Sequence, residues 1–237
     1  MSGTRADGGP ADRAEERAAL LREIQAEMRE TAAWTGRATL SPRVVAALRN
    51  VPRHEFVPSE SQDAAYANYP LPIGSGQTIS QPYVVALMTE LADVEPGDRV
   101  LEVGTGCGYQ AAVLAELASR VYTIETVPRL AAEARERLAR LGYANVEVRE
   151  GDGWAGWPDK SPFDAILVTA AARDIPPPLV AQLAPGGRLV LPVGDTPFSQ
   201  HLMLVEKDAE GNVKERGVLP VAFVPLTRRS VPSGGDS

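Results

Sequence analysis

Glycine occupies every second position in one short stretch of the chain, at Gly104, Gly106 and Gly108. The apolar segment 99–103 before it has the pattern of a buried strand, and the segment 108–118 after it has the pattern of a helix. Glycine leaves the backbone bare, and the first N–H groups of a helix can bind a ligand. The stretch is therefore predicted to bind a cofactor; the alternative is that three glycines only make a tight turn from strand to helix.

The spacing of the glycines and the charges around them indicate which cofactor this is. A dinucleotide-binding loop reads G-x-G-x-x-G, whereas this loop reads G-x-G-x-G and continues with Tyr109. No Lys or Arg occurs between positions 100 and 119, Glu102 lies just before the loop, and Glu125 ends the next predicted strand. A carboxylate at that strand end can accept hydrogen bonds from both hydroxyls of a ribose. Because acidic surroundings favour a sulfonium cation over a pyrophosphate, we expect S-adenosyl-L-methionine, with S-adenosyl-L-homocysteine as its product.

Two more predicted strands end in polar or small residues. The strand at 145–149 is followed by Gly-Asp-Gly at 151–153, where Asp152 is expected to accept a hydrogen bond from an adenine amino group. The strand at 163–168 is followed by Thr-Ala-Ala-Ala, whose small side chains leave room for a bulky substrate. Methyltransferases that act on amide or exocyclic nitrogens commonly carry Asn/Asp-Pro-Pro-aromatic there, so a nitrogen acceptor is disfavoured. The alternatives are an Asp-Gly turn and the first turn of a helix.

The segment 59–81 has few regular signals and contains several prolines and glycines, so it is predicted to be a long loop with a function. It ends before a helix that is expected to begin at Pro82. Ser80 or Gln81 is a candidate N-cap for that helix, and Thr78 with Gln81 has the spacing of a capping box. Capping alone is an alternative explanation for these residues.

Strand and helix patterns alternate from residue 99 onward, which predicts an α/β, Rossmann-like, doubly wound sheet of seven strands. Only seven residues, 194–200, separate the fifth strand from the sixth, too few for a crossover helix. The last strands are therefore expected to form an antiparallel C-terminal meander. The sheet strands are predicted at 99–103, 121–125, 145–149, 163–168, 187–193, 201–206 and 218–225, and helices at 12–31, 42–50, 83–91, 108–118, 128–141 and 175–183.

We expect a single domain at 12–228. Within it, 12–95 is predicted to hold the N-terminal helices and a cover for the substrate, and 96–228 the cofactor-binding core. The segments 1–11 and 229–237 are predicted to be disordered or flexible tails.

Composition narrows the classes of function. The chain has 237 residues, a net charge of −7 and no basic segment interleaved with aromatics, so nucleic acid is not expected as a partner. The single Cys107, with only His54 and His201 as imidazoles, gives metal catalysis little to build on. No apolar run approaches the roughly 20 residues that span a bilayer, and the first ten residues lack the apolar core of a signal peptide. We expect no membrane partner and a cytoplasmic location.

Five motifs in order resemble the protein-L-isoaspartate O-methyltransferases, and the resemblance extends from about residue 41 to residue 226. They read PIGSGQTISQP at 72–82, LEVGTGCGYQ at 101–110, GDG at 151–153, FDAILVTAA at 163–171 and FVPL at 223–226. The resemblance implies methyl transfer from S-adenosyl-L-methionine to the free carboxyl of L-isoaspartyl residues in damaged proteins and peptides. The ester then cyclises to a succinimide, which reopens partly to normal aspartate.

The resemblance also assigns roles to residues of this chain. Ser80 matches the serine regarded as the family's active-site residue. The contacts to the cofactor are carried over to Gln81, Glu102, Gly104, Thr105, Gly106, Gly108, Glu125, Asp152, Gly153 and Gln200. Walls that hold the substrate peptide extended are carried over to Thr78, Ile79, Thr169, Ala170, Ala171, Val224 and Pro225. Cys107 departs from the family, which often has serine there, and is expected to pack inside the loop without acting as a catalytic thiol.

Three other functions stay open from the sequence. A methyltransferase of the same fold could act on a carboxyl of a biosynthetic peptide or small molecule. A dehydrogenase would need to bind nicotinamide, which the acidic G-x-G-x-G loop disfavours. A noncatalytic peptide-binding module would bind without methyl transfer, and the intact cofactor motifs argue against it. We expect the protein to act as a monomer.

Overall fold

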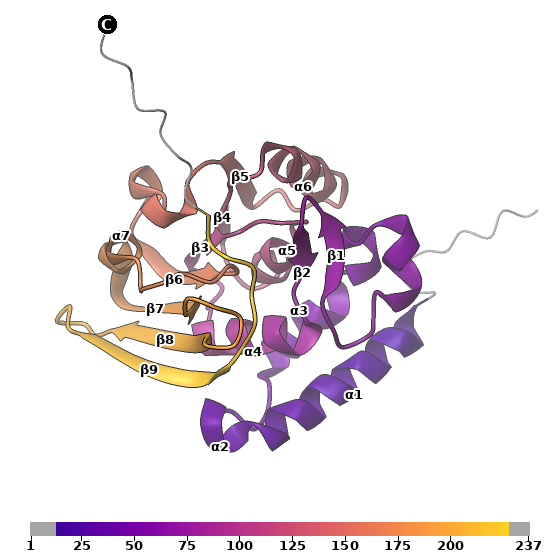
Figure 1. Ribbon diagram of the computed structural model, residues 1–237, viewed down its shortest axis with the longest axis horizontal. Coiled ribbons are helices and arrows are strands. Elements are labelled where there is room, and N and C mark those ends of the chain that lie inside the picture. Colours follow the sequence, from indigo (N-terminus) through magenta and orange to yellow (C-terminus); the bar gives the residue numbers. More distant parts are fainter. Residues whose placement is uncertain (1–12, 228–237) are drawn as a thin grey trace, which may run out of the picture.

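Seven strands form one sheet in the computed structural model of the chain, which describes residues 13–227 (Figure 1). The order across the sheet is β5-β4-β3-β6-β7-β8-β9. The first five of these are parallel to one another, and β8 runs antiparallel to both of its neighbours. The predicted α/β fold and its antiparallel C-terminal strands are thereby confirmed. The strands are β3 (Arg99–Val103), β4 (Arg120–Glu125), β5 (Val146–Glu150), β6 (Phe163–Val168), β7 (Leu183–Val193), β8 (His201–Lys207) and β9 (Val213–Pro220).

The last strand begins and ends earlier than predicted. It was expected at 218–225, but β9 pairs with β8 from Val213, opposite Lys207, to Pro220, opposite His201. Beyond Pro220 the backbone no longer pairs with β8. The side chain of Gln200 binds it instead, because Gln200 Oε1 accepts from the N–H of Phe223 at 2.6 Å. The segment 221–227 therefore leaves the sheet edge.

The predicted helices are present, several of them shorter than expected. The helix predicted at 42–50 is present with these bounds, and Ser41 caps it, because the Ser41 Oγ accepts from the N–H of Val44 at 3.4 Å. The segment 175–183 contains only a short helix, because the extended backbone of β7 already begins at Leu183. The helices are α1 (Ala14–Glu30), α2 (Ala32–Thr35), α3 (Pro42–Asn50), α4 (Pro82–Ala92), α5 (Tyr109–Ala115), α6 (Pro128–Arg140) and α7 (Pro177–Ala181).

The two faces of the sheet carry separate apolar clusters. Successive strand residues such as Val100 and Leu101 belong to different clusters, as the alternation of side chains along a strand requires. The larger cluster joins the sheet to α4, α5 and α6, with α1 and α3 packed beyond α4. The smaller one is closed by Trp157 and by Leu179 of α7. The N-terminal helices thus form a second layer on one face only.

The segment 59–81 is more regular than the predicted loop. It contains one 3-10 helix, η2 (Ser59–Ala64), and two antiparallel strands, β1 (Leu71–Gly74) and β2 (Gln77–Ile79). Positive φ angles at 74, 75 and 76 let the chain reverse between the two strands. The sequence favours a loop because these strands are only three to four residues long and carry a proline. Together β1 and β2 form a hairpin that is separate from the seven-stranded sheet (Figure 1).

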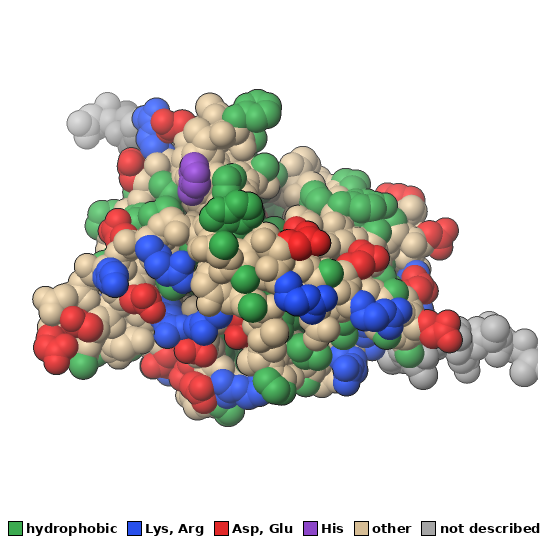
Figure 2. Space-filling model, turned by 90° about the horizontal axis from the view of Figure 1, so that it is seen from below, with side chains coloured by type: hydrophobic (Ala, Val, Ile, Leu, Met, Phe, Trp, Pro, Cys, Tyr) green, Lys and Arg blue, Asp and Glu red, His purple; other side chains and the backbone are tan. Residues whose placement is uncertain are grey.

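The surface carries both signs of charge. On the face shown in Figure 2, Lys and Arg side chains are interspersed with Asp and Glu. Within residues 13–227, no helix is both long and apolar enough to cross a membrane. The tails predicted at 1–11 and 229–237 lie outside the described residues.

Helix α1 is predicted to contribute to stability through its buried face. Ile24 is 1% exposed within the larger cluster, so Ile24→Ala should lower the free energy of unfolding by roughly 2–5 kcal/mol in chemical denaturation. Arg22→Ala, on the exposed face of the same helix, should change it by less than about 0.5 kcal/mol. Equal effects of the two substitutions would contradict the observed packing.

Candidate active site

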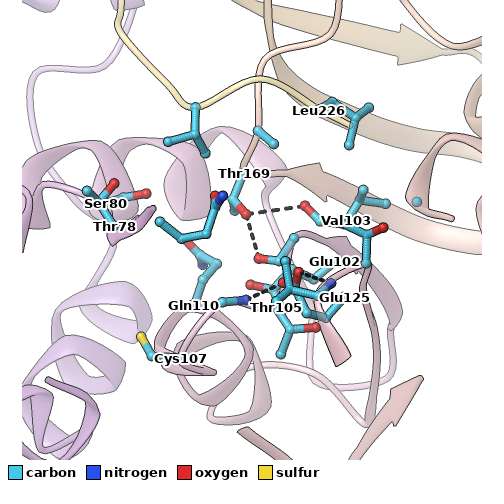
Figure 3. A pocket seen from close by; sticks show the side chains of 18 of the residues that line it. Thr78, Ser80, Glu102, Val103, Thr105, Cys107, Gln110, Glu125, Thr169 and Leu226 are labelled. Carbon is cyan, nitrogen blue, oxygen red and sulfur yellow. Dashed lines mark hydrogen bonds between the residues drawn. The ribbon is translucent and has the colours of Figure 1, made fainter. Parts of the chain in front are cut away.

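A pocket opens at the carboxyl ends of β3, β4 and β6 (Figure 3). The chain runs from β3 outward to β5 and then returns to β6 on the other side of β3, and ligands of open α/β sheets bind at such a reversal. Its lining combines apolar side chains with a small number of polar groups, as the lining of small-molecule sites does. The predicted site residues that line it are Thr78, Ile79, Ser80, Glu102, Gly104, Thr105, Gly106, Glu125, Gly153, Thr169, Ala170, Val224 and Pro225.

The glycine loop is shaped by close packing as well as by its place at the pocket. Gly104 has φ +98°, and a Cβ built on it would lie 2.5 Å from Oγ1 of Thr169. Gly108 has φ +91°, and its Cβ would lie 3.2 Å from Leu138 on α6. Residues other than glycine rarely adopt these backbone φ values. The fold alone therefore requires glycine at both positions, and Gly108 does so without lining the pocket.

Glu125 fastens the glycine loop to the neighbouring strand. Its two carboxylate oxygens accept from the N–H of Gly106 at 2.8 Å and from the N–H of Val127 at 2.9 Å. The side chain is 5% exposed and lines the pocket. Each oxygen keeps a lone pair beyond its backbone contact, so the predicted contact with ribose hydroxyls is compatible with these bonds.

Glu102 places a buried carboxyl on the floor of the pocket. Its Oε2 accepts from Oγ1 of Thr123 at 2.5 Å, and that hydroxyl lies 2.6 Å from Oγ1 of Thr105. Its Oε1 is buried and has no hydrogen-bond partner. Burial raises the pKa of Glu102 to about 8, and the nearby Glu125 adds to the rise while Thr123 opposes it. In the absence of a cation the carboxyl is thus mostly protonated at neutral pH.

Gln110 is a pocket residue to which the sequence assigned no role. Its Nε2 donates to Oγ1 of Thr89 at 3.0 Å, and its buried Oε1 has no partner. The only hint in the sequence is a polar residue at the start of the otherwise apolar helix α5. Gln110 and Glu102 each line the pocket and keep a buried oxygen without a partner, and no Lys or Arg of the described chain lines the pocket. Such a set of acceptors fits the cationic S-adenosyl-L-methionine and does not fit a pyrophosphate.

Ser80 lies across the pocket from the carboxylates, next to Thr78 (Figure 3). The N-cap of α4 is Gln81, and its side chain makes no capping bond. The capping box predicted from Thr78 and Gln81 is therefore wrong. Within the described residues the hydroxyl of Ser80 donates to no other group, and only its backbone carbonyl is bonded, to Arg53. The Ser80 side chain is available to a ligand.

The segment 221–227 crosses the mouth of the pocket above the end of β6 (Figure 3). Ala171 holds it by its backbone, donating to the carbonyl of Val224 at 2.8 Å and accepting from the N–H of Leu226 at 2.7 Å. Thr169, on the same side, donates from Oγ1 to the carbonyl of Gly104 at 2.7 Å. Ala170, Val224 and Pro225 are left as small or apolar walls.

Five residues predicted in the site do not line the pocket. Gln81 donates to Glu27 at 3.4 Å, and Asp152 accepts from the N–H of Trp154 at 2.9 Å, which is the Asp-Gly turn given above as its alternative. Gln200 is 3% exposed and binds the backbone of Phe223. The five residues are Gln81, Gly108, Asp152, Ala171 and Gln200, and their contacts with a ligand remain predictions.

Cys107 lines the pocket as a buried thiol. Burial raises its pKa, which keeps it protonated and poorly nucleophilic. In residues 13–227, no three His, Cys, Asp or Glu side chains gather where they could hold a metal ion.

Comparisons with known proteins single out one family. The model of the family "Protein-L-isoaspartate(D-aspartate) O-methyltransferase (PCMT)" matches residues 29–231. Protein-L-isoaspartate O-methyltransferase 2 of Polaromonas sp. (strain JS666 / ATCC BAA-500) is 62% identical over 208 residues, which are 88% of this chain and 99% of that protein. The protein of the same name from Syntrophobacter fumaroxidans is 58% identical over 211 residues, covering 89% of this chain and 85% of that protein.

Solved structures share the fold. A protein-L-isoaspartate O-methyltransferase superposes with a TM-score of 0.73 at 29% identity, covering 89% of this chain and 66% of that one. A crystal structure from Plasmodium falciparum that bears the same family name, in complex with S-adenosyl-L-homocysteine, gives a TM-score of 0.71 at 23% identity. It covers 88% of this chain and 99% of that one.

The raised pKa of Glu102 predicts a distinct pH dependence of stability. Between pH 4.5, the ordinary value, and about 8, the unfolded chain loses the proton that the folded protein keeps, so stability falls as pH rises through this range. Glu102→Gln removes this loss. Relative to wild type, the variant should gain on the order of 3 kcal/mol of unfolding free energy between pH 5 and pH 8 in urea titrations.

The control is Glu23→Gln, whose side chain lies on the exposed face of α1. Its stability difference from wild type should be the same at both pH values. A difference for Glu102→Gln that is equally constant would show that Glu102 does not carry the extra proton.

Proposed function

The chain belongs to the protein-L-isoaspartate(D-aspartate) O-methyltransferase family, and from this premise we propose how its pocket performs the family's reaction. The protein is a protein-L-isoaspartate O-methyltransferase, and its methyl donor is S-adenosyl-L-methionine. Bound in the pocket, this cofactor supplies an electrophilic methyl group on a sulfonium. The acceptor is the free carboxyl of an L-isoaspartyl residue in a protein or peptide.

The observation that carries the proposed arrangement is the free hydroxyl of Ser80 opposite the unpaired acceptors of the floor. Glu102 and Gln110 line one side, each with a buried oxygen that has no hydrogen-bond partner, and Ser80 lines the other side with a free hydroxyl. Oxygen acceptors attract the cationic end of the donor, and a hydroxyl donor attracts an anionic carboxylate. The two reactants are thereby sorted to opposite sides of one pocket.

The residues that line the pocket suffice for methyl transfer because the reaction requires few catalytic groups. A carboxyl with an ordinary pKa near 4 is already ionised at neutral pH, so methylation of its oxygen needs no general base. What the protein must contribute is alignment of the acceptor and exclusion of water. Ser80 aligns the carboxylate, while Ile79 from the hairpin and Val224 with Pro225 from the segment 221–227 cover it.

Further parts of the proposal rest on the sequence. We assign residues 12–95 to the N-terminal helices and the cover of the substrate, and 96–228 to the cofactor-binding core, within one domain. Thr78, Thr169 and Ala170, which line the pocket, are assigned to the walls of an extended substrate peptide. We also expect the protein to act as a monomer in the cytoplasm.

Two peptides that differ only in Asp or isoAsp at one position test the function. With S-adenosyl-L-methionine labelled in its methyl group, label should enter the isoAsp peptide alone and should be lost in base, because the product is a methyl ester. Equal labelling of both peptides, or base-stable label, would contradict repair. Label in neither peptide but in a small carboxylic acid would instead favour a biosynthetic carboxyl methyltransferase.

Ser80→Ala tests the alignment role. Because only the hydroxyl is removed, turnover with the isoAsp peptide should fall at least about tenfold, while the affinity for S-adenosyl-L-homocysteine, measured by calorimetry, should stay within about twofold. Ser59→Ala is the matched control, a hydroxyl lost from the exposed start of η2 outside the pocket lining, and should affect turnover much less. Unchanged turnover of Ser80→Ala would leave Ser80 without a part in the reaction.

A further inference from the structure

Arg53 is a buried cation without an acidic partner, directly behind the wall of the pocket. The side chain is 0% exposed. Its Nε donates to the carbonyl of Ala65 at 2.9 Å and its Nη2 to the carbonyl of Ser80 at 2.8 Å, while Nη1 is buried without a partner. Among the described residues no Asp or Glu forms an ion pair with it. Burying such a charge uncompensated is costly, so its retention calls for an explanation.

The two hydrogen bonds of Arg53 join the ends of the segment that covers the pocket. Ala65 precedes the hairpin β1–β2 and Ser80 follows it, so one guanidinium fixes both points where this segment begins and ends. The planar fork of arginine suits two carbonyls at once. Arg53 therefore determines where Ser80 stands relative to the sheet.

The guanidinium also lies close to the substrate side of the pocket. Its central carbon is 4.8 Å from the ring centre of Tyr109, and Tyr109 and Ser80 both line the cavity. The aromatic face stabilises the cation only in part. The positive charge is thus separated from the pocket interior by a single layer of residues.

A positive charge on this side of the pocket would stabilise a carboxylate acceptor. Its lining contains Glu102 and Glu125 and, in the part of the chain that the structure describes, no Lys or Arg. A carboxylate acceptor entering from water loses hydration and meets these acidic groups. Arg53 is placed beside Ser80, where the acceptor is expected.

We propose that Arg53 is a positioning residue that fixes Ser80 through its backbone carbonyl and, by its buried charge, makes the pocket select an ionised carboxyl over a neutral group of the same shape. This inference rests on the proposed function, because it takes the isoaspartyl carboxyl as the ligand beside Ser80. The carboxylate of the substrate is the anion that compensates the charge of Arg53.

The test compares two ligands in the intact protein with S-adenosyl-L-homocysteine present. One is the isoAsp peptide, and the other is the same peptide with the acceptor carboxyl replaced by a carboxamide. Wild type should bind the carboxylate at least about tenfold more tightly than the carboxamide. Equal affinities in wild type would overturn the proposal without any variant being made.

Two variants then assign this preference to Arg53. In Arg53→Met the ratio of the two affinities should fall to nearly one, whereas Arg53→Lys, which keeps the charge but not the fork, should retain an intermediate ratio. A purely structural role would weaken both peptides equally and leave the ratio unchanged, which would overturn the proposal. Arg22→Met, with its exposed side chain on α1, is the matched control and should keep the wild-type ratio. If Arg53→Met does not fold, an unchanged ratio in Arg53→Lys together with a weakened affinity for both peptides would equally overturn it.

Binding is measured without turnover, so this inference and the proposed function fail in different ways. Methylation of the isoAsp peptide without a preference for the carboxylate rejects the role of Arg53 alone. Absence of methylation when S-adenosyl-L-methionine replaces S-adenosyl-L-homocysteine rejects the proposed function.

Discussion

The close approach of Thr169 to Gly104 joins the two strands between which the pocket opens. A Cβ at Gly104 would lie 2.5 Å from the Thr169 hydroxyl, which donates to the carbonyl of the same glycine at 2.7 Å. Glu125 fixes the other side of the loop through the N–H of Gly106. The loop is thus held from both neighbouring strands, and these contacts orient the residues of the pocket floor. Such orientation is what a reaction without a general base depends on.

Burial gives the charged groups around this floor their properties. Glu102 is fully buried, which raises the pKa of its carboxyl to about 8 and leaves one oxygen without a partner. On the opposite side Arg53 is equally buried, also without an ion-pair partner within the described residues. Burial likewise lowers the pKa of this guanidinium, although arginine stays charged in proteins. A pocket that leaves an acceptor on one wall and a cation behind the other is suited to a cationic donor and an anionic acceptor.

Two segments distant in the sequence complete the pocket from above. The hairpin β1–β2 belongs to the N-terminal part, whereas the segment 221–227 follows the last strand. Each is held by a single polar side chain on backbone groups: Arg53 binds the carbonyls of Ala65 and Ser80, and Gln200 binds the N–H and carbonyl of Phe223. Both holding residues lie outside the pocket lining. Substitutions that affect substrate binding are therefore expected beyond the residues that touch a ligand.

The sequence by itself determined the sheet, the antiparallel end, the glycine loop and the family, because these depend on local pattern: alternation of apolar residues, short connections and motifs read in order. It also identified about half of the pocket lining, in part because the carboxyl ends of parallel strands must meet at one edge and in part through the family resemblance. It did not determine the hairpin at 71–79 or the end of β9, because very short strands are stabilised by their partners more than by their own residues. Only the tertiary structure decided the parts of Gln110, Gln200 and Arg53. Their roles depend on which hydrogen-bond partners surround each buried side chain. Those partners lie up to 27 positions away along the chain.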